Sequence, residues 1–457
     1  MRVSRAALAL SAVLLSCAAR DDAPAPRPQG WHVADGAIRD PDGRTVILRG
    51  ANLSSAHKKK PYLSDFGPAD YARLQREWGL GAVRFLVSWA GIEPERGVYD
   101  EAYLDAIGER LDWARDAGLL VVLDMHQDLF GEGFGGDGAP RWTCDASRYA
   151  AFVPATPWFL GYLDPNVIAC FDRLWTDPEL RAHFVDAWRR LAARFAGRAN
   201  VIGFDILNEP HWGSMSIIGF EEERLAPFYV DVIKAVREQA PRWLVVAEPS
   251  ASRNLGYPST LPKLPFEGVV YAPHAYDSDA ESGKGFSPER REAITRKLRE
   301  MRDEATAQGA ALLIGEYGGV ADDPGITPYM DAQYDAAGAV AASTMYWAYD
   351  KDDGYGMLRP DGREKTELMD VVARPYPARV AGALEAYAYD EGAKVLTVRM
   401  RPDASVSAPT EIAAPARVWP DGAAVECGGC RVEQVPGLIR LFDIPAGDTR
   451  VVTVRAR

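Results

Sequence analysis

Short apolar runs alternate with amphipathic stretches along most of the chain. Eight runs have the length of buried strands, at Val46–Leu48, Ala82–Val87, Leu119–Met125, Val201–Leu207, Trp243–Ala247, Gly268–Tyr271, Ala311–Gly315 and Thr344–Trp347. Apolar residues recur at helical spacing in Ala69–Trp78, Glu101–Ala117, Pro178–Phe195, Glu221–Gln239, Pro288–Gln308 and Pro328–Ala341. Buried strands joined by crossover helices form a parallel sheet, and eight repeats predict a closed (β/α)8 TIM barrel of the α/β class.

Two segments depart from this repeat. Residues 31–48 contain the turn signals Asp35-Gly36 and Pro41-Asp42-Gly43 and are predicted to form hairpins. The connection after the fifth run, residues 248–267, is rich in Pro and Ser and has no clear helical pattern. We therefore expect the fifth unit of the barrel to be irregular.

From about residue 376 the pattern changes to short alternating runs between Gly, Pro and Asp turns. These runs are Leu384–Tyr389, Lys394–Met400, Arg417–Trp419, Arg431–Val435, Ile439–Phe442 and Thr449–Val454. They predict a small antiparallel β-sandwich over residues 376–457, after a barrel over residues 31–375. The sandwich either binds carbohydrate or packs against the barrel.

The N-terminus has the pattern of an export signal. Arg2 and Arg5 precede an apolar stretch that is too short to span a bilayer. The stretch ends in Leu14-Leu15-Ser16-Cys17, which resembles a bacterial lipobox. We expect residues 1–17 to be a lipoprotein signal peptide with lipidation at Cys17, and residues 18–30 to be a flexible tether. The chain would then be an exported, membrane-anchored lipoprotein of the outer membrane or cell surface; a plainly secreted protein is the alternative.

Four further cysteines remain in a chain with this export pattern. An even number in an oxidising compartment indicates disulfides, and the economical pairing joins Cys144 to Cys170 and Cys427 to Cys430. The Cys427-Gly-Gly-Cys430 segment also has the form of a redox motif or half a zinc site. It lies among predicted strands with no second ligand pair, which favours a structural disulfide.

Composition and charge exclude several functions. Of 457 residues, 47% are hydrophobic and 26% are charged, which is typical of a globular protein. The net charge is −13, and no basic block with interleaved aromatics is present, so a nucleic-acid partner is not expected. The 12 Trp residues exceed an ordinary share and indicate either additional core or contacts with sugar or lipid.

Polar residues gather at the ends of the predicted barrel strands. In such barrels the reactive groups lie at the C-terminal ends of the strands. Nine polar or aromatic residues occupy these positions here: Arg84, His126, Asp128, Asn208, Glu209, His274, Tyr276, Glu316 and Trp347. A hydrogen-bonding role in the fold explains any one of them, but their convergence predicts an active site.

Two carboxylates suggest the chemistry. Glu209 and Glu316 follow the fourth and seventh runs. Cleavage of an acetal requires an acid to protonate the leaving oxygen and a carboxylate to capture the oxocarbenium-like carbon. The pair supplies both if the two environments drive the pKa values apart. Arg84 is the nearest cation for an ionised nucleophile, Tyr276 is a candidate hydrogen-bond donor to it, and Trp347 is a candidate floor beneath the sugar ring.

These residues together resemble glycoside hydrolase family 5 of clan A. The resemblance rests on Arg49-Gly-Ala-Asn52, Arg84, His126, Asn208-Glu209-Pro210, His274-Ala-Tyr276, Glu316 and Trp347. It implies retaining hydrolysis, with Glu209 as acid/base and Glu316 as nucleophile. It also implies that Asn208 holds the substrate 2-hydroxyl, and that His274 and Tyr276 support the two carboxylates.

Further motifs resemble the endoglycoceramidase-like branch of that family. They are His126-Gln127-Asp128, the Gly-rich segment 135–142 and Leu225-Ala-Pro-Phe-Tyr229. The branch cleaves between sugar and ceramide in glycosphingolipids, so this resemblance implies a glycolipid substrate. His126, Asp128 and one of Lys58, Lys59 and Lys60 are candidate contacts to sugar hydroxyls.

Two loops on the catalytic side are rich in large apolar residues. They are 149–171, with Phe152, Val153, Trp158, Phe159 and Leu160 among them, and 212–220, with Trp212 and Ile218. A continuous apolar surface would mark contact with a lipid substrate or a membrane. Alternatively the two loops pack against each other as a small satellite core.

No cofactor and no metal are expected. The segment 350–354 has the beginning of a calcium loop but lacks the distal Glu, and neither a phosphate-binding loop nor a Rossmann motif is evident. The leading hypothesis is a retaining glycosidase acting on glycosphingolipids. Two alternatives are a retaining β-glucanase or β-glycosidase acting on soluble glycans, and a non-catalytic glycan-binding lipoprotein.

Overall fold

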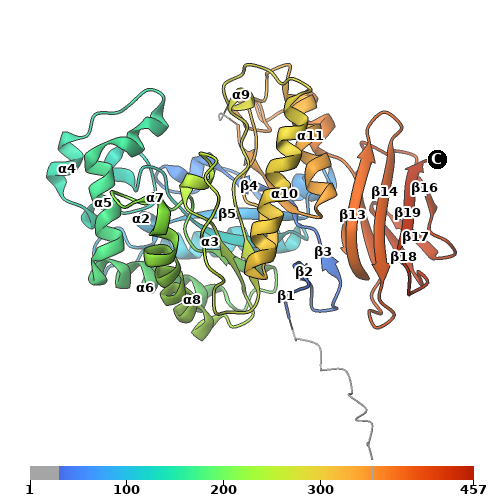
Figure 1. Ribbon diagram of the computed structural model, residues 1–457, viewed down its shortest axis with the longest axis horizontal. Helices are drawn as coiled ribbons and strands as arrows, with labels where there is room; N and C mark the ends of the chain where they lie inside the picture. The colour runs from blue at the N-terminus through green and yellow to red at the C-terminus, as the bar shows by residue number, and fades with distance from the viewer. Residues whose placement is uncertain (1–29, 352–353) are drawn as a thin grey trace, which may run out of the picture.

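The fold is built around a closed barrel of eight parallel strands, which confirms the predicted TIM barrel. The computed structural model describes residues 30–351 and 354–457 (Figure 1). Around the barrel the strands are β4 (Arg49–Leu53), β5 (Ala82–Ser88), β6 (Leu120–His126), β7 (Val201–Asp205), β8 (Leu244–Ala247), β9 (Val269–Tyr271), β10 (Ala311–Ile314) and β11 (Ser343–Tyr349). β11 pairs with β4 and closes the barrel.

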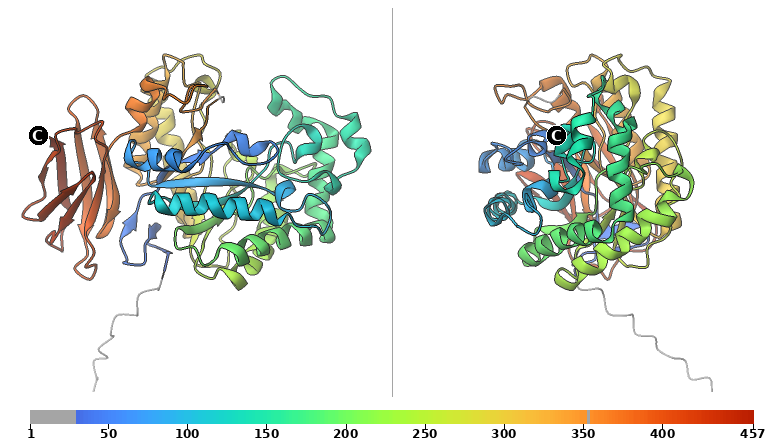
Figure 2. Two further views of the ribbon diagram at one scale, coloured as in Figure 1. Left: turned by 180° about the vertical axis from the view of Figure 1, so that it is seen from behind. Right: turned by 90° about the vertical axis from the view of Figure 1, so that its left-hand side faces the viewer.

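Helices surround the barrel (Figure 2). The longer ones are α1 (Pro68–Arg76), α3 (Glu101–Asp116), α5 (Pro165–Thr176), α6 (Pro178–Phe195), α8 (Ala226–Gln239), α10 (Arg290–Gln308) and α11 (Ile326–Ala339). Shorter ones are α2 (Trp89–Ile92), α4 (Ala146–Ala151), α7 (Ile217–Phe220), α9 (Ser278–Glu281) and α12 (Thr366–Val372). α6 shows why they form: the Asp177 side chain caps the first backbone N–H groups, Pro178 opens the helix, and one apolar face is buried.

The first barrel strand differs from the sequence prediction. Val46 belongs to β3 (Thr45–Val46), and the barrel begins with β4, which was not recognised because Arg49 and Asn52 interrupt its apolar character. Asn52 is buried and donates to backbone carbonyls of Gly315 and of β11. The Arg49 guanidinium lies over three Tyr rings between the barrel and the C-terminal region. Both polar residues therefore have buried partners that the hydrophobic pattern does not reveal.

The C-terminal region contains two antiparallel sheets. One has four strands, in the order β13 (Gly382–Asp390), β14 (Val395–Pro402), β19 (Arg450–Ala456) and β16 (Ala423–Glu426). The other has seven, in the order β1 (His32–Ala34), β2 (Ala37–Arg39), β3, β12 (Tyr376–Val380), β15 (Thr410–Ala414), β18 (Gly437–Phe442) and β17 (Arg431–Val435). The N-terminal hairpins thus extend a C-terminal sheet, although the sequence analysis placed them within the barrel domain.

One predicted C-terminal strand is a turn. Arg417–Trp419 lies between β15 and β16, neither of which was predicted. Arg417 pairs with Glu364 and Asp370 beside the barrel, and the Trp419 indole donates to the Lys394 carbonyl. The Arg417 and Trp419 side chains therefore anchor the turn between β15 and β16, and their backbone does not form a strand.

Both disulfides have the pairing that the cysteine count suggested. Cys144 is bonded to Cys170, and Cys427 is bonded to Cys430. Cys17, the predicted signal peptide and nearly all of the predicted tether lie outside the described residues, as do Asp352 and Asp353 of the loop with calcium-like spacing. Among the residues that are described, no helix is long and apolar enough to cross a membrane.

Candidate active site

The predicted site residues converge at one end of the barrel. Arg84 lies on β5 and His126 ends β6, while Trp347 lies on β11. Glu209, His274 and Glu316 stand in the loops that directly follow β7, β9 and β10. Each of these side chains contacts at least one of the others or a shared neighbour.

Arg84 is the centre of this cluster. Its guanidinium is fully buried and lies within hydrogen-bonding distance of four carboxylates and two side-chain amides. The partners are Asp124 at 2.8 Å, Asp205 at 2.9 Å, Glu248 at 2.7 Å, Glu316 at 2.8 Å, Asn52 at 3.0 Å and Asn208 at 3.0 Å. The planar guanidinium, with five N–H donors, fixes the relative positions of side chains from five segments of the chain.

One guanidinium does not compensate four buried carboxylates. Burial raises the pKa of Asp124 to about 7, that of Asp205 to about 6 and that of Glu248 to about 8, against the opposing attraction of Arg84. These three groups therefore retain protons at a pH where exposed carboxyl groups have lost theirs.

Glu316 is held as a carboxylate. Arg84 Nη1 donates to Oε1 at 2.8 Å, and the Tyr276 hydroxyl donates to Oε2 at 2.8 Å. Burial alone would raise the pKa of Glu316, but the cations of His274 and Arg84 hold it below its ordinary value. An ionised carboxylate with both oxygens fixed is suited to act as a nucleophile.

Glu209 adopts a strained backbone conformation. Its φ of 43° lies in the left-handed region, which costs a non-glycine residue about 1–3 kcal/mol. The Glu209 N–H donates to Glu248 at 2.8 Å, and the Gln127 side chain donates to the Glu209 carbonyl at 3.0 Å. These bonds hold the conformation that directs the partly exposed carboxyl group towards Glu316.

The Glu209 carboxyl group has two donors on the same oxygen. His274 Nδ1 lies 2.7 Å from Oε1, and Asn254 Nδ2 donates to Oε1 at 2.6 Å. Burial would lower the pKa of His274, but Glu248 and Glu316 hold it well above its ordinary value. Burial would raise the pKa of Glu209, yet the His274 hydrogen bond keeps it below its usual value.

The pKa values of both glutamates therefore lie below their ordinary values in the free protein, so neither carboxyl group has the raised pKa that suits a general acid. Both carboxyl groups lie near the His274 imidazolium, which lowers the pKa of each. Substrate that covers the exposed edge of Glu209 would desolvate it and favour its protonated form. The separation of the two carboxyl groups is short: Glu209, His274 and Glu316 offer atoms that all lie within 4.8 Å of one another.

Of the three candidate lysines, Lys58 is the one that enters the site. Its Nζ lies 2.5 Å from Asp128 Oδ2 and 4.2 Å from the centroid of the Trp347 ring. Lys59 is exposed, and Lys60 is an exposed partner of Glu132 at 3.2 Å. The His126 and Trp347 rings are stacked, with centroids 5.4 Å apart. Lys58, Asp128, His126 and Trp347 thus form one polar and aromatic cluster beside Glu316.

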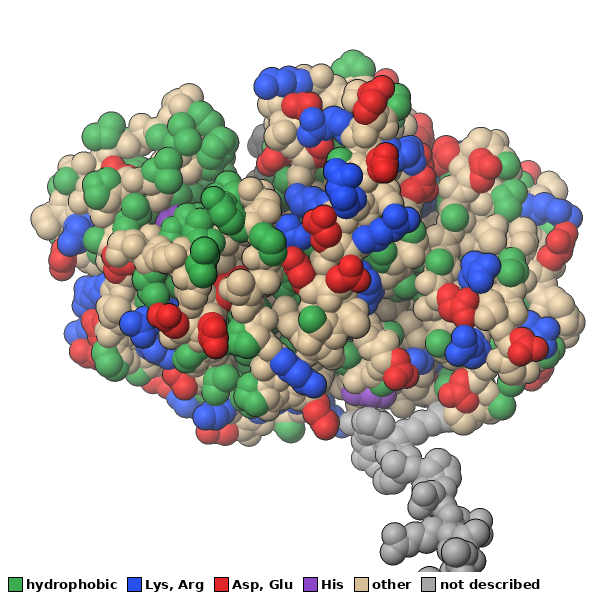
Figure 3. Space-filling model, in the orientation of Figure 1, with side chains coloured by type: hydrophobic (Ala, Val, Ile, Leu, Met, Phe, Trp, Pro, Cys, Tyr) green, Lys and Arg blue, Asp and Glu red, His purple; other side chains and the backbone are tan. Residues whose placement is uncertain are grey.

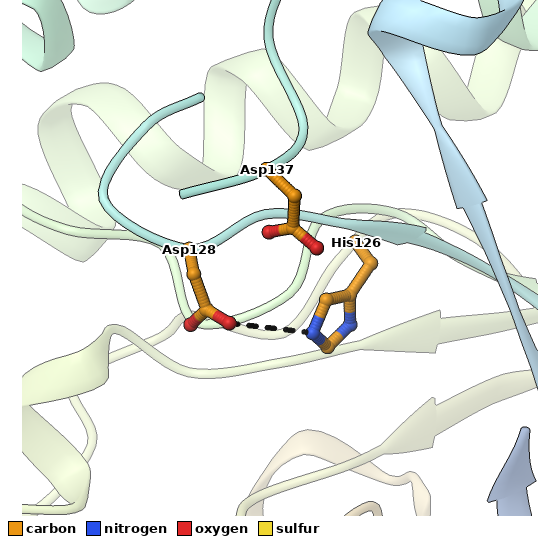
Figure 4. Close-up of side chains that lie close together, drawn as sticks. All are labelled: His126, Asp128 and Asp137. Carbon is orange, nitrogen blue, oxygen red and sulfur yellow. Dashed lines mark ion pairs between the residues drawn. The ribbon is translucent and has the colours of Figure 1, made fainter. Parts of the chain in front are cut away.

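Asp137 joins this cluster from the Gly-rich segment (Figure 4). Its backbone pairs with that of Asp128, and its carboxyl group is buried next to His126 and Asp128. Asp137 Oδ1 and His126 Nε2 are buried, with no hydrogen-bond partner among the described side chains. Burial raises the pKa of Asp137 well above its ordinary value, and burial together with Lys58 keeps the pKa of His126 low. His126 Nε2 faces Asp128 Oδ2 at 3.9 Å, the contact drawn as a dashed line in Figure 4.

Three groups in the described part of the chain have the composition of metal sites. They are His126, Asp128 and Asp137; Glu209, His274 and Glu316; and Asp124, Asp205 and Glu248. In each group a cation of the protein already contacts a carboxylate: Lys58 in the first, His274 in the second and Arg84 in the third. These side-chain cations supply the compensating charge that a metal would supply.

Some apolar residues of the two loops are packed in the core, and others form an exposed surface. Tyr149, Phe152, Phe171, Trp212 and Phe220 pack into or against the main core. Val153, Trp158, Phe159, Leu160 and Ile218 are exposed, with Trp158 at 52% and Ile218 at 83%. Figure 3 shows hydrophobic side chains gathered over the lobe that contains α4 and α5. The Tyr162 hydroxyl, 3.4 Å from Asp128, links this lobe to the polar cluster.

Sequence reasoning missed five polar residues of the site. Asp124 and Asp205 lie inside apolar strands, and Glu248 directly follows the fifth barrel strand. Their positions in the sequence could therefore have indicated that they belong to the site. Asp137 and Asn254 lie in irregular loops whose course the periodic pattern does not indicate.

Comparison with known families gives two matches. A profile described as cellulase (glycosyl hydrolase family 5) matches residues 40–353, and a profile described as the glycoside hydrolase family 5 C-terminal domain matches residues 374–455. The chain is 29% identical to endoglycoceramidase I of Rhodococcus hoagii, over 93% of this chain and 87% of that protein. It is also 29% identical to a glucosylceramidase of Cryptococcus neoformans, over 42% of this chain and 34% of that protein.

Among solved structures, the fold is similar to that of endo-glycoceramidase II from Rhodococcus sp. in a complex with ganglioside GM3. The TM-score is 0.84 and the sequence identity 32%, over 92% of this chain and 99% of that one.

The protonated carboxyl groups around Arg84 predict how stability depends on pH. Because Asp124, Asp205 and Glu248 have raised pKa values, the folded state binds more protons than the unfolded state above about pH 4. Their stabilising contribution is lost as the pH rises through about 6 to 8. We expect the thermal midpoint to fall by several degrees between pH 5.5 and 8.5, measured by circular dichroism.

The matched variant is Glu248→Gln, which cannot titrate and should give a shallower decline over this pH range. A thermal midpoint of the wild type that rises from pH 5.5 to 8.5 would contradict the assigned protonation states.

Proposed function

The chain belongs to glycoside hydrolase family 5, and on that premise we propose that it cleaves the β-glycosidic bond between sugar and ceramide in glycosphingolipids, with retention of configuration. The observation that carries the mechanism is the short separation of Glu209 and Glu316, since one carboxyl oxygen of each lies within 4.8 Å of the other. Retaining glycosidases have carboxyl groups about 5–5.5 Å apart, whereas inverting enzymes need about 6.5–9.5 Å to admit a water.

The first step forms a covalent intermediate. Glu316, ionised beside Arg84 and oriented by Tyr276, attacks the anomeric carbon. Glu209 protonates the glycosidic oxygen as the bond to the leaving alcohol breaks. The excess charge of the oxocarbenium-like transition state is positive, and the carboxylates around it stabilise that charge.

The second step releases the sugar. Glu209, now ionised, takes a proton from a water molecule that attacks the anomeric carbon, and the bond to Glu316 breaks. His274, which touches both carboxyl groups, stabilises the ionised form of whichever one carries the charge. Asn208 accepts from the Arg84 guanidinium and donates to the Gln127 carbonyl, and this fixed amide supports its proposed role in holding the substrate 2-hydroxyl.

The substrate class rests on two kinds of surface that meet at the site. Lys58, Asp128 and His126 offer donors and acceptors for sugar hydroxyls, and Trp347 offers an aromatic face. The exposed apolar side chains near Trp158 and Ile218 match a lipid-bearing leaving group. The similarity to endoglycoceramidases over nearly the whole chain supports the same class.

The decisive assay uses the purified protein with ganglioside GM3, glucosylceramide and a panel of soluble β-glucans. We expect free ceramide and free sugar from at least one glycolipid, detected by mass spectrometry. Cleavage of soluble glycans alone would overturn the proposed substrate class.

Two active-site variants separate the roles of the carboxylates. Glu316→Ala should lose turnover on every substrate. Glu209→Ala should lose about 10²–10⁴-fold on glycolipid but form the covalent intermediate with a dinitrophenyl glycoside, whose leaving group needs no protonation. Burst kinetics of dinitrophenol release measure this difference. A Glu316→Ala variant that hydrolyses like the wild type would contradict the assignment.

Lys58 and Lys60 form a matched pair for sugar binding. Lys58→Met removes the ammonium group that bridges Asp128 and the Trp347 face, so we expect kcat/KM to fall by about tenfold or more, the value of a charge-assisted hydrogen bond. Lys60→Met removes a charge of the same sign that lies outside the site and should change kcat/KM less than twofold. Equal effects of the two substitutions would remove Lys58 from the substrate-binding residues.

We also propose that the chain is exported by a bacterium and held at a membrane through lipidated Cys17. The basic start, the apolar stretch and the Leu14–Cys17 motif support this proposal. In cells that express the full chain, the wild type should fractionate with membranes and incorporate labelled palmitate. Cys17→Ser should incorporate none; equal incorporation by both would refute lipidation at Cys17.

A further inference from the structure

The irregular fifth connection forms a firmly anchored loop beside the acid/base. Glu221 is buried and accepts hydrogen bonds from the Ser250 N–H at 2.7 Å, from the Ser259 hydroxyl and from the Thr260 N–H and hydroxyl. Glu304 accepts from the Arg253 side chain at 3.0 Å and from the Ser259 N–H at 3.2 Å. The two carboxylates hold both ends of residues 250–260, which contain one short 3-10 helix at Ala251–Arg253, so the apex after it has a defined position.

The apex places one polar side chain and two apolar ones at the mouth of the barrel. Asn254 is exposed and donates through Nδ2 to Glu209 Oε1 at 2.6 Å. Leu255 and Tyr257 follow it, with 67% and 50% of their surfaces exposed. Asn254 therefore contacts the Glu209 carboxyl group from the exposed side, whereas His274 contacts it from the buried side.

This arrangement determines which oxygen of Glu209 carries the catalytic proton. Oε1 accepts from both His274 and Asn254, and no donor to Oε2 is present within the described residues. We therefore expect the proton of the acid form on Oε2. The Asn254 amide lies next to that oxygen, and its carbonyl Oδ1 and second N–H remain available for a further partner.

The loop also lies on the leaving-group side. The sugar-binding cluster comes from β11 and from the loops after β4 and β6, whereas Asn254 follows β8, which is opposite β4 in the closed barrel. Glu209, after β7, stands between the two. A sugar bound on Lys58 and Asp128 therefore directs its aglycone past Glu209 towards Asn254.

We propose that Asn254 recognises the polar head of the aglycone and that Leu255 and Tyr257 receive the first part of its alkyl chains. This inference rests on the proposed function. In ceramide, an amide and a hydroxyl lie within three carbons of the glycosidic oxygen, and the long chains begin directly beyond them. An asparagine amide beside the proton donor, followed by exposed Leu and Tyr side chains, reproduces that order of polar and apolar groups.

The test compares two substrates with the same sugar. Lactosylceramide carries the amide and hydroxyl, and octyl β-lactoside carries neither. Both are assayed in the same detergent with the wild type, Asn254→Ala, Asn254→Ser and, as the matched control, Leu255→Ala. The wild type should cleave both. Asn254→Ala should lose about tenfold more kcat/KM on lactosylceramide than on octyl lactoside, which is the value of one hydrogen bond, and Asn254→Ser should lie between.

Leu255→Ala should lower kcat/KM on both substrates and leave their ratio unchanged. Because Asn254 stabilises ionised Glu209, Asn254→Ala should also move the basic limb of the pH profile upward on both substrates. An unchanged substrate ratio in folded Asn254→Ala overturns the inference while leaving the proposed function intact. A wild type that cleaves neither lactosylceramide nor any other glycosphingolipid overturns both the inference and the proposed function.

Discussion

One buried guanidinium constrains the whole catalytic end of the barrel. Arg84 can stay charged without water only because carboxylates and amides from β4, β6, β7, β8 and β10 or the loops after them surround it. Removing one partner of such a buried ion pair typically costs about 3–5 kcal/mol. The strand ends of the barrel are arranged so that this cation has its partners, and the same arrangement brings Glu209 and Glu316 together.

The surroundings of Arg84 also give its carboxyl partners different pKa values. Burial raises the pKa values of Asp124 and Glu248, whereas Arg84 and His274 hold the pKa of Glu316 below its ordinary value and Tyr276 donates to its second oxygen. Glu248 connects the two levels, because it accepts from Arg84 and from the strained backbone of Glu209. One hydrogen-bonded network therefore positions both Glu316 and Glu209, the proposed nucleophile and acid/base.

Much of the fold could be predicted from sequence, because buried parallel strands are apolar along their whole length. Seven barrel strands follow that rule closely enough to be recognised, although β5, β6 and β7 carry the buried charged residues Arg84, Asp124 and Asp205. β4 does not, because Arg49 and Asn52 have buried partners that only the folded structure brings near. The pairing of β3 with β12 joins segments more than 300 residues apart, and no local pattern encodes such a contact.

Part of the site could likewise be predicted from sequence, and part could not. Residues at strand ends could be located, since a barrel brings those ends together. Lys58 could not be chosen from three adjacent lysines, because the loop conformation decides which ammonium reaches Asp128. Asn254 could not be identified, because buried Glu221 and Glu304 shape its loop through contacts that are distant in sequence.

The central claim is that the carboxylate beside Arg84 is the nucleophile of a retaining reaction. An activated 2-deoxy-2-fluoro β-glycoside tests it most directly, because the fluorine slows hydrolysis of the covalent intermediate enough to isolate it. After digestion, mass spectrometry should find the sugar on the peptide that contains Glu316, and no label in Glu316→Gln. A label on another carboxylate, or turnover of natural substrate with inverted configuration, would contradict the account.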